Sequence, residues 1–79
     1  MIIVKILGSG CANCKRVEQI VRQVVEKENV EAEIIKVTDF DEITKYPILS
    51  TPGLVINEKV ASAGRIPSPA EVLEWLKAA

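Results

Sequence analysis

The sequence contains no histidine, and its aromatic residues amount to one phenylalanine, one tyrosine and one tryptophan. The lack of histidine removes the commonest general base and the commonest metal ligand from the possible chemistry. With so few aromatic rings, the core has to be built from aliphatic side chains. Ten basic residues against eleven acidic ones give a net charge of −1 at pH 7. We therefore expect no electrostatic capture of nucleic acid or of an anionic membrane.

Long hydrophobic runs are also missing. No stretch approaches the roughly 18 apolar residues of a membrane-spanning helix, and the apolar residues 1–4 are not preceded by the basic region of a signal peptide. A chain of 79 residues has room for one core. We expect residues 1–79 to form a single domain that acts as a cytoplasmic monomer.

Hydrophobic periodicity predicts an alternation of strands and helices. Apolar side chains recur at helical spacing from residue 17 to residue 25, and Asn29 is a suitable end for that helix. A short helix is expected over residues 40–45, where Pro47 follows. The last helix begins at Ser68, which opens a Ser-Pro-Ala-Glu capping sequence. The runs that indicate strands are residues 2–7, 31–37, 54–56 and 59–63.

The predicted order of elements is therefore β-α-β-α-β-β-α. Two strands joined by a helix of this length form a right-handed unit with parallel pairing. The last two strands, separated by a turn at residues 57–58, form an antiparallel hairpin. These patterns predict an α/β fold in which three helices flank one mixed four-stranded sheet.

The two cysteines, Cys11 and Cys14, lie where the first strand gives way to the first helix. Residues three apart are neighbours on a helical turn, at a separation compatible with a disulfide. The start of the helix favours a thiolate, because unpaired N–H groups and the positive end of the helix dipole lie there. Gly8 and Gly10 allow a sharp turn and leave Cys11 uncrowded. We expect Cys11 to attack a disulfide and Cys14 to resolve the mixed disulfide, with Lys15 adding positive charge nearby.

Three other uses of a cysteine pair compete with this hypothesis: a structural disulfide, a zinc site and a copper(I) site. A purely structural disulfide across so short a loop removes little chain entropy, and the cytoplasm is reducing. A zinc site needs four ligands, which two cysteines supply only in a shared dimer site. Copper(I) accepts two soft thiolates, and the loop over residues 8–14 resembles that of small heavy-metal-associated domains. Ser9, however, stands where that family has methionine, and the helix expected before the hairpin breaks that family's element order.

The Cys11-x-x-Cys14 motif after the first strand, Thr51-Pro52 before the third and Gly64 before the last helix occur in one chain. In these features the sequence resembles a minimal thioredoxin-fold protein. It is most similar to the small, glutaredoxin-sized redox-active disulfide proteins of archaea and bacteria, over essentially the whole chain. The resemblance implies a thiol–disulfide oxidoreductase that needs no metal or dissociable organic cofactor. Its partners would be a protein or small-molecule disulfide and an upstream reductant.

The resemblance also implies roles for individual residues. Pro52 would follow a cis peptide bond beside the cysteines, and Thr51 would pair with the extended backbone of a substrate, with Gly10 completing the groove. Lys5 stands where thioredoxins carry a buried acid, which makes it a possible modulator of the thiolate besides Lys15, although a lysine at a strand edge also fits. No glutathione-holding sequence follows the hairpin. A copper(I) carrier and a partner-binding redox sensor remain as alternatives.

Overall fold

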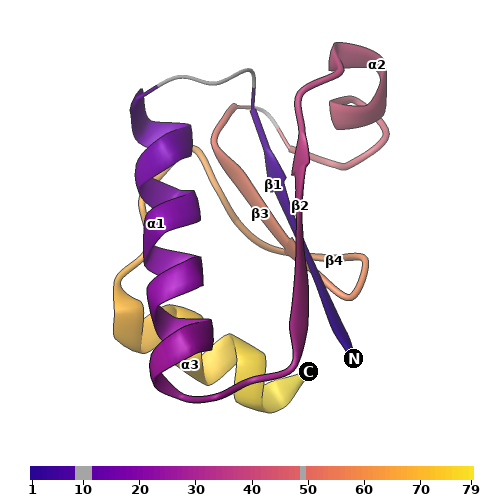
Figure 1. The fold of residues 1–79 in the computed structure, drawn as a ribbon. Helices are drawn as coiled ribbons and strands as arrows, with labels where there is room; N and C mark the ends of the chain where they lie inside the picture. Colours follow the sequence, from indigo (N-terminus) through magenta and orange to yellow (C-terminus); the bar gives the residue numbers. More distant parts are fainter. Residues whose placement is uncertain (9–11, 49) are drawn as a thin grey trace.

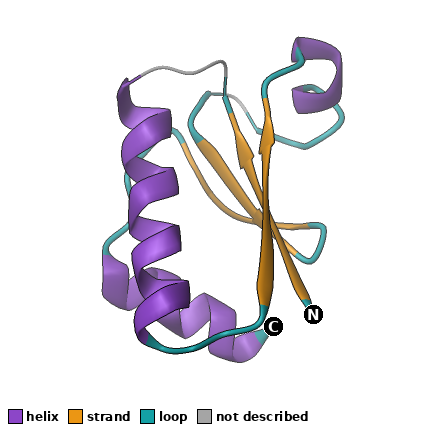
Figure 2. Cartoon of the chain, in the orientation of Figure 1, coloured by secondary structure: helices purple, strands orange, loops and turns teal. Residues whose placement is uncertain are grey.

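The computed structural model describes residues 1–8, 12–48 and 50–79. The described residues form seven elements in the predicted order (Figure 2). In chain order, these are β1 (Ile2–Leu7), α1 (Ala12–Lys27), β2 (Ala32–Val37), α2 (Phe40–Ile43), β3 (Gly53–Ile56), β4 (Lys59–Ala63) and α3 (Pro69–Ala78). The strands make one mixed sheet, so the predicted α/β fold class is confirmed. No helix in this described part of the chain is both long enough and apolar enough to span a bilayer.

The sheet has the strand order β2-β1-β3-β4. β1 pairs with β2 in parallel and with β3 antiparallel, and β3 and β4 form the predicted hairpin. The hairpin turns at Asn57 and Glu58, both of which have positive φ angles, as tight hairpin turns require. At the carboxyl end of β1, Leu7 pairs with Val37 on one side and with Gly53 on the other. This register places the carboxyl end of β1 beside the start of β3.

α1 and α3 cover one face of the sheet (Figure 1). α1 turns a regular buried stripe toward β1 and β3, and the stripe begins with Cys14. In the view of Figure 1, α3 crosses near the lower end of α1, and it adds Val72 and Leu76 to the same core. The buried members of this core, called the main core here, are Val4, Ile6, Val17, Val21, Val24, Leu54, Ile56, Val72 and Leu76. The aliphatic core expected from the scarcity of aromatic residues is confirmed.

The opposite face of the sheet has a much smaller cover. Its buried cluster, called the second cluster here, consists of Leu7, Ile43 and Val55. α2 contributes only one turn, and the prediction that it extends to residue 45 was wrong. The residue before a proline is disfavoured in the helical conformation, so the chain leaves the helix ahead of Tyr46 and Pro47. The chain also turns Phe40 outward, with 75 % of its surface exposed.

The ends of the helices follow local sequence closely. The Ser68 hydroxyl accepts a hydrogen bond from the Glu71 N–H at 3.2 Å, and the Glu71 carboxylate accepts one from the Ser68 N–H at 3.0 Å. This is the predicted capping box, and it fixes the first turn of α3. α1 ends at Lys27, and Asn29 then takes a φ of 54°, which confirms it as the stop of that helix.

Candidate redox site

The candidate site lies at the carboxyl end of β1, where α1 begins and β3 starts. The predicted nucleophile Cys11 and its neighbours Ser9 and Gly10 fall outside the described residues. Cys14 is described: it lies in the first turn of α1, is 4 % exposed and is disulfide-bonded. Cys14 is therefore buried, while the predicted difference in accessibility between the two sulfurs lies outside the described residues.

Gly8 leaves the space that the Cys14 sulfur occupies. A Cβ on Gly8 would overlap the Cys14 Sγ and would stand 3.8 Å from the Cβ of Thr51. The Gly8 N–H donates a hydrogen bond to the Val37 carbonyl at 3.0 Å, which holds the turn against β2. Gly8 was predicted to allow a sharp turn, and in the structure a side chain there would also collide with the sulfur. Gly8, Cys14 and Thr51 therefore lie together.

The peptide bond between Thr51 and Pro52 is cis, as the resemblance implies. Pro52 is buried, and its carbonyl accepts a hydrogen bond from the Gly64 N–H at 2.9 Å. Gly64 has a φ of 74°, and a Cβ there would collide with the Ser50 hydroxyl. The hydrogen bond ties Pro52 to the residue that follows β4, while Thr51 is exposed.

A cavity of about 80 Å³ adjoins Cys14. It lies between α1 and the carboxyl ends of β1 and β2, and its lining consists of Ile6, Gly8, Cys14, Lys15, Glu18, Lys36 and Thr38. Lys15 was predicted from its position beside the cysteines. Glu18 and Lys36 were missed, although Glu18 follows Cys14 by four residues and therefore lies on the same face of α1.

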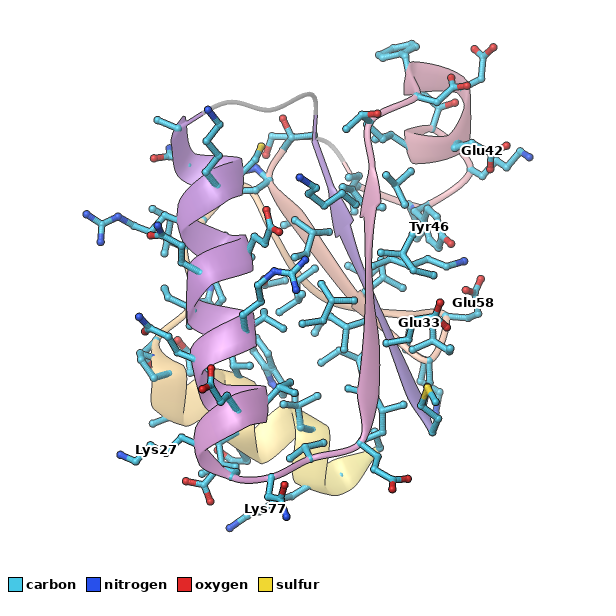
Figure 3. The ribbon with its side chains drawn as sticks, in the orientation of Figure 1. Lys27, Glu33, Glu42, Tyr46, Glu58 and Lys77 are labelled. Carbon is cyan, nitrogen blue, oxygen red and sulfur yellow. The ribbon has the colours of Figure 1, made fainter. Side chains whose placement is uncertain are left out.

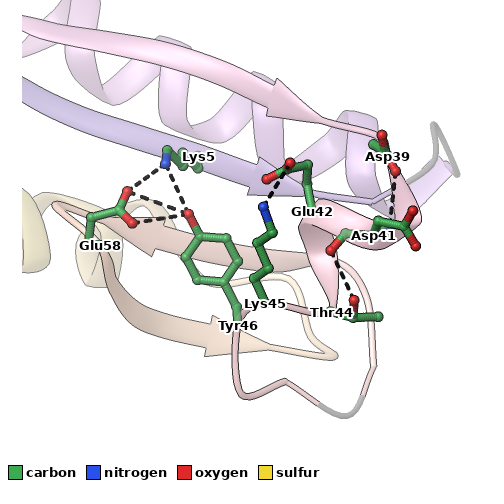
Figure 4. Close-up of polar contacts among 8 residues, drawn as sticks. All are labelled: Lys5, Asp39, Asp41, Glu42, Thr44, Lys45, Tyr46 and Glu58. Carbon is green, nitrogen blue, oxygen red and sulfur yellow. Dashed lines mark hydrogen bonds and ion pairs between the residues drawn. The ribbon is translucent and has the colours of Figure 1, made fainter.

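Lys5 makes its contacts on the other face of the sheet (Figure 4). Its Nζ lies 2.5 Å from a Glu58 carboxylate oxygen and 2.9 Å from the Tyr46 hydroxyl. Tyr46 and Glu58 are on the side of the sheet away from α1 (Figure 3). The hydrogen bond to Glu58 raises the pKa of Lys5, and the same bond lowers the pKa of the Glu58 carboxyl. The structure therefore provides Lys5 with partners away from Cys14.

The described residues include no group of three Cys, His, Asp or Glu side chains arranged to hold a metal ion. Comparison with known proteins bears directly on the choice between redox chemistry and metal transport. A family model described as a thioredoxin domain matches residues 2–77. The chain belongs to the thioredoxin domain family.

Two archaeal proteins named thioredoxin are similar to this thioredoxin-family protein along most of their length. That of Methanocaldococcus jannaschii is 38 % identical over 77 residues, which cover 98 % of this chain and 88 % of that protein. That of Methanothermobacter thermautotrophicus is 32 % identical over 76 residues, covering 96 % of this chain and 99 % of that protein. The fold is also similar to the crystal structure of the germline-specific thioredoxin Deadhead of Drosophila melanogaster. The TM-score is 0.67 at 20 % identity, over 98 % of this chain and 79 % of that one.

These relationships confirm the family and the fold that the sequence predicted. They also confirm the predicted class of enzyme, a thioredoxin-like thiol–disulfide oxidoreductase. They do not support the alternative of a copper(I) carrier.

Proposed function

We propose that this protein reduces disulfides of protein or small-molecule partners with Cys11 as the nucleophile and Cys14 as the resolving thiol. The observation that supports it best is the place of Cys14, buried in the first turn of α1 and packed against Gly8 beside Thr51. Such a sulfur is shielded from partners in solution but is one helical turn from the position of Cys11 in the sequence. Residues 1–79 act as one domain, a monomer in the cytoplasm.

The exchange proceeds in two steps. The Cys11 thiolate attacks one sulfur of the partner's disulfide, forms a mixed disulfide with it and releases the other sulfur as a thiolate. Cys14 then loses its proton and attacks the Cys11 sulfur, and the partner leaves as its second thiol. The partner gains two electrons and two protons, and the protein is left with a Cys11–Cys14 disulfide. An upstream dithiol reductant returns that disulfide to the two thiols.

Thr51, Pro52 and Gly10 are the residues that bind the partner. Thr51 is exposed, so its backbone is accessible for hydrogen bonds to an extended segment of the partner. The buried Pro52, whose carbonyl accepts a hydrogen bond from Gly64, holds the chain next to Thr51 in place. Lys15, an exposed residue beside the sulfur, adds positive charge that favours the thiolate.

Insulin-disulfide reduction with a dithiol donor tests this proposal. The wild type should turn over, and Cys11→Ser should abolish turnover because no sulfur remains to attack. Cys14→Ser should stop after the first step and accumulate a mixed disulfide that mass spectrometry detects. The two variants make the same chemical change three residues apart, so each controls for the other. Turnover that survives in both variants would contradict the proposal.

A further inference from the structure

The cavity beside Cys14 contains charged groups that the mechanism above does not use. Its charged lining residues are Lys15 and Glu18 from α1 and Lys36 from β2, and Thr38 adds a hydroxyl. A volume of about 80 Å³ exceeds the space that one water molecule needs. The polar lining offers hydrogen bonds to such water. The cavity therefore has room for a water molecule between Cys14 and the polar groups that line it.

Glu18 is the carboxylate among the described residues that line this cavity. It lies one turn beyond Cys14 on α1, so both side chains project from the same face of the helix. Only 17 % of the Glu18 side chain is exposed, and two cations contact it. Its Oε2 lies 2.8 Å from the Arg22 Nε, and its Oε1 lies 3.7 Å from the Lys36 Nζ. A half-buried carboxylate is thus held in place from two elements.

The resolving step requires a proton acceptor. A cysteine thiol ordinarily has a pKa of about 8.5, so only a small fraction of it is ionised near neutral pH. Cys14 is nearly fully buried, with the apolar Val17 next along its stripe of α1. Because the thiolate is the attacking form, a carboxylate that lines the same cavity would accelerate the attack at neutral pH by accepting the proton.

We propose that Glu18 accepts the proton of Cys14 when Cys14 attacks the mixed disulfide, an inference that rests on the function proposed above. The S–H bond of Cys14 breaks, and its proton passes through the cavity to the Glu18 carboxylate. The new Cys14–Cys11 bond forms as the bond from Cys11 to the partner breaks, and the electron pair leaves on the partner's sulfur. Glu18 then returns its proton to solvent or to the departing thiolate. Arg22 and Lys36 are positioning residues that hold the carboxylate at the lining of the cavity that Cys14 shares.

The aromatic disulfide dithiobis(nitrobenzoate) separates the two steps in one experiment. Attack by Cys11 on the reagent releases a first coloured thiolate, and attack by Cys14 on the resulting mixed disulfide releases a second. With the reduced protein in stopped flow, Glu18→Gln should leave the first phase unchanged. It should slow the second phase about tenfold or more near pH 6.5, and the difference should vanish above the thiol pKa. Glu18→Asp should restore part of the rate.

Glu26→Gln is the matched control, because Glu26 is an exposed residue of the same helix that does not line the cavity. It should leave both phases as in the wild type. A second phase that is unchanged in Glu18→Gln, or faster because a repelling charge has gone, would overturn the role of Glu18. If the wild type itself released only one thiolate, the two-cysteine mechanism would fail instead. The two failures are therefore distinguishable.

Discussion

The two faces of the sheet are built differently. The main core, under α1 and α3, is aliphatic and draws its buried residues from both helices and the two central strands. On the other face, the second cluster has three buried residues, and the charged and hydroxyl groups of Lys5, Tyr46 and Glu58 continue the cover. The main core positions Cys14, whereas the second face holds the segment that leads to Thr51. Stability and the position of the resolving sulfur therefore depend mainly on the same face.

Alternation along β1 places Lys5 on the second face. Val4 and Ile6 on either side of it belong to the main core, so Lys5 points the other way. Its ammonium lies 5.7 Å from the centre of the Tyr46 ring as well as in contact with Glu58. A charged residue is tolerated in a central strand here because its cover is thin and polar.

The largest expected effect compares one leucine from each face. Leu54 belongs to the main core and Leu7 to the second cluster, and neither is exposed. Leu54→Ala should cost about 4 kcal/mol of unfolding free energy, because its dense surroundings cannot collapse into the cavity. Leu7→Ala should cost about 2 to 3 kcal/mol, since the thinner cover relaxes more easily. Urea denaturation measures both, and equal losses would contradict the contrast between the faces.

The next effect concerns the space around the Cys14 sulfur. Gly8→Ala should lower stability by about 1 to 3 kcal/mol and slow disulfide exchange, because the added methyl group overlaps the Cys14 Sγ. Gly53→Ala is the control: its methyl group would meet Ile48 Cδ1 at 3.0 Å and the Cδ1 and Cβ of Leu7 at 3.2 and 3.3 Å, so it crowds apolar side chains instead of the sulfur. Denaturation and insulin reduction together test the pair. Disulfide exchange as fast in Gly8→Ala as in Gly53→Ala would show that the space between Gly8 and the Cys14 sulfur does not affect the exchange rate.

Two serine substitutions compare a capping hydroxyl with a buried one. Ser68→Ala removes the cap of α3 and should cost about 1 kcal/mol of unfolding free energy. The Ser62 hydroxyl is buried without a hydrogen-bond partner among the described residues. Ser62→Ala should therefore be neutral or slightly stabilising, because it removes an unsatisfied polar group. Thermal denaturation distinguishes them, and a loss at position 62 as large as that at 68 would be inconsistent with this difference.

Lowering the pH should reduce the stability that Glu71 contributes in the first turn of α3, over a defined range of pH. Hydrogen bonds from Arg65 lower the pKa of the Glu71 carboxyl from about 4.5 to about 2. A carboxyl whose pKa is lower in the folded state contributes stability above its unfolded pKa and loses it as the pH falls through the folded one. The stability advantage of the wild type over Glu71→Gln should therefore be constant above about pH 5 and shrink toward pH 2. Urea denaturation at several pH values checks this, and an advantage that persists unchanged at pH 2 would contradict it.

The smallest effect concerns the two lysines that the sequence nominated as thiol modulators. Lys15→Met should slow the attack of Cys11 on the aromatic disulfide by about two- to fivefold, the range expected from one exposed charge. Lys5→Met should change that rate by less than about twofold, because Lys5 is engaged with Glu58 and Tyr46 on the other face. Stopped-flow kinetics compares the two variants. A larger loss of rate in Lys5→Met than in Lys15→Met would show that Lys5, not only Lys15, affects the Cys11 thiolate.

The sequence predicted those features that depend on short stretches of chain. The capping box at Ser68 and Glu71, the turn at Asn57 and the stripe of α1 each follow from residues within a few positions of one another. α2 is shorter than predicted, because Pro47 disfavours the helical conformation of Tyr46 before it.

The contacts that the sequence did not predict join distant parts of the chain. Lys5 meets Tyr46 and Glu58 across 41 and 53 positions, so the pairing depends on how the sheet and the hairpin assemble. Glu18 and Lys36 meet beside Cys14 only once β2 has docked against β1 in parallel register. Charged residues are not part of a hydrophobic period, so the sequence pattern does not reveal such a contact. The spacing of four residues between Cys14 and Glu18 is the signal that could have identified Glu18.

The central claim is that Cys11 and Cys14 convert reversibly between two thiols and one internal disulfide. Equilibration of the protein in thiol–disulfide buffers of graded potential, followed by alkylation and intact-mass measurement, tests it most directly. The account predicts a single two-electron transition between a species that takes up two alkyl groups and a monomeric species that takes up none. Two alkylated cysteines at every potential, or a disulfide found only between separate chains, would contradict it.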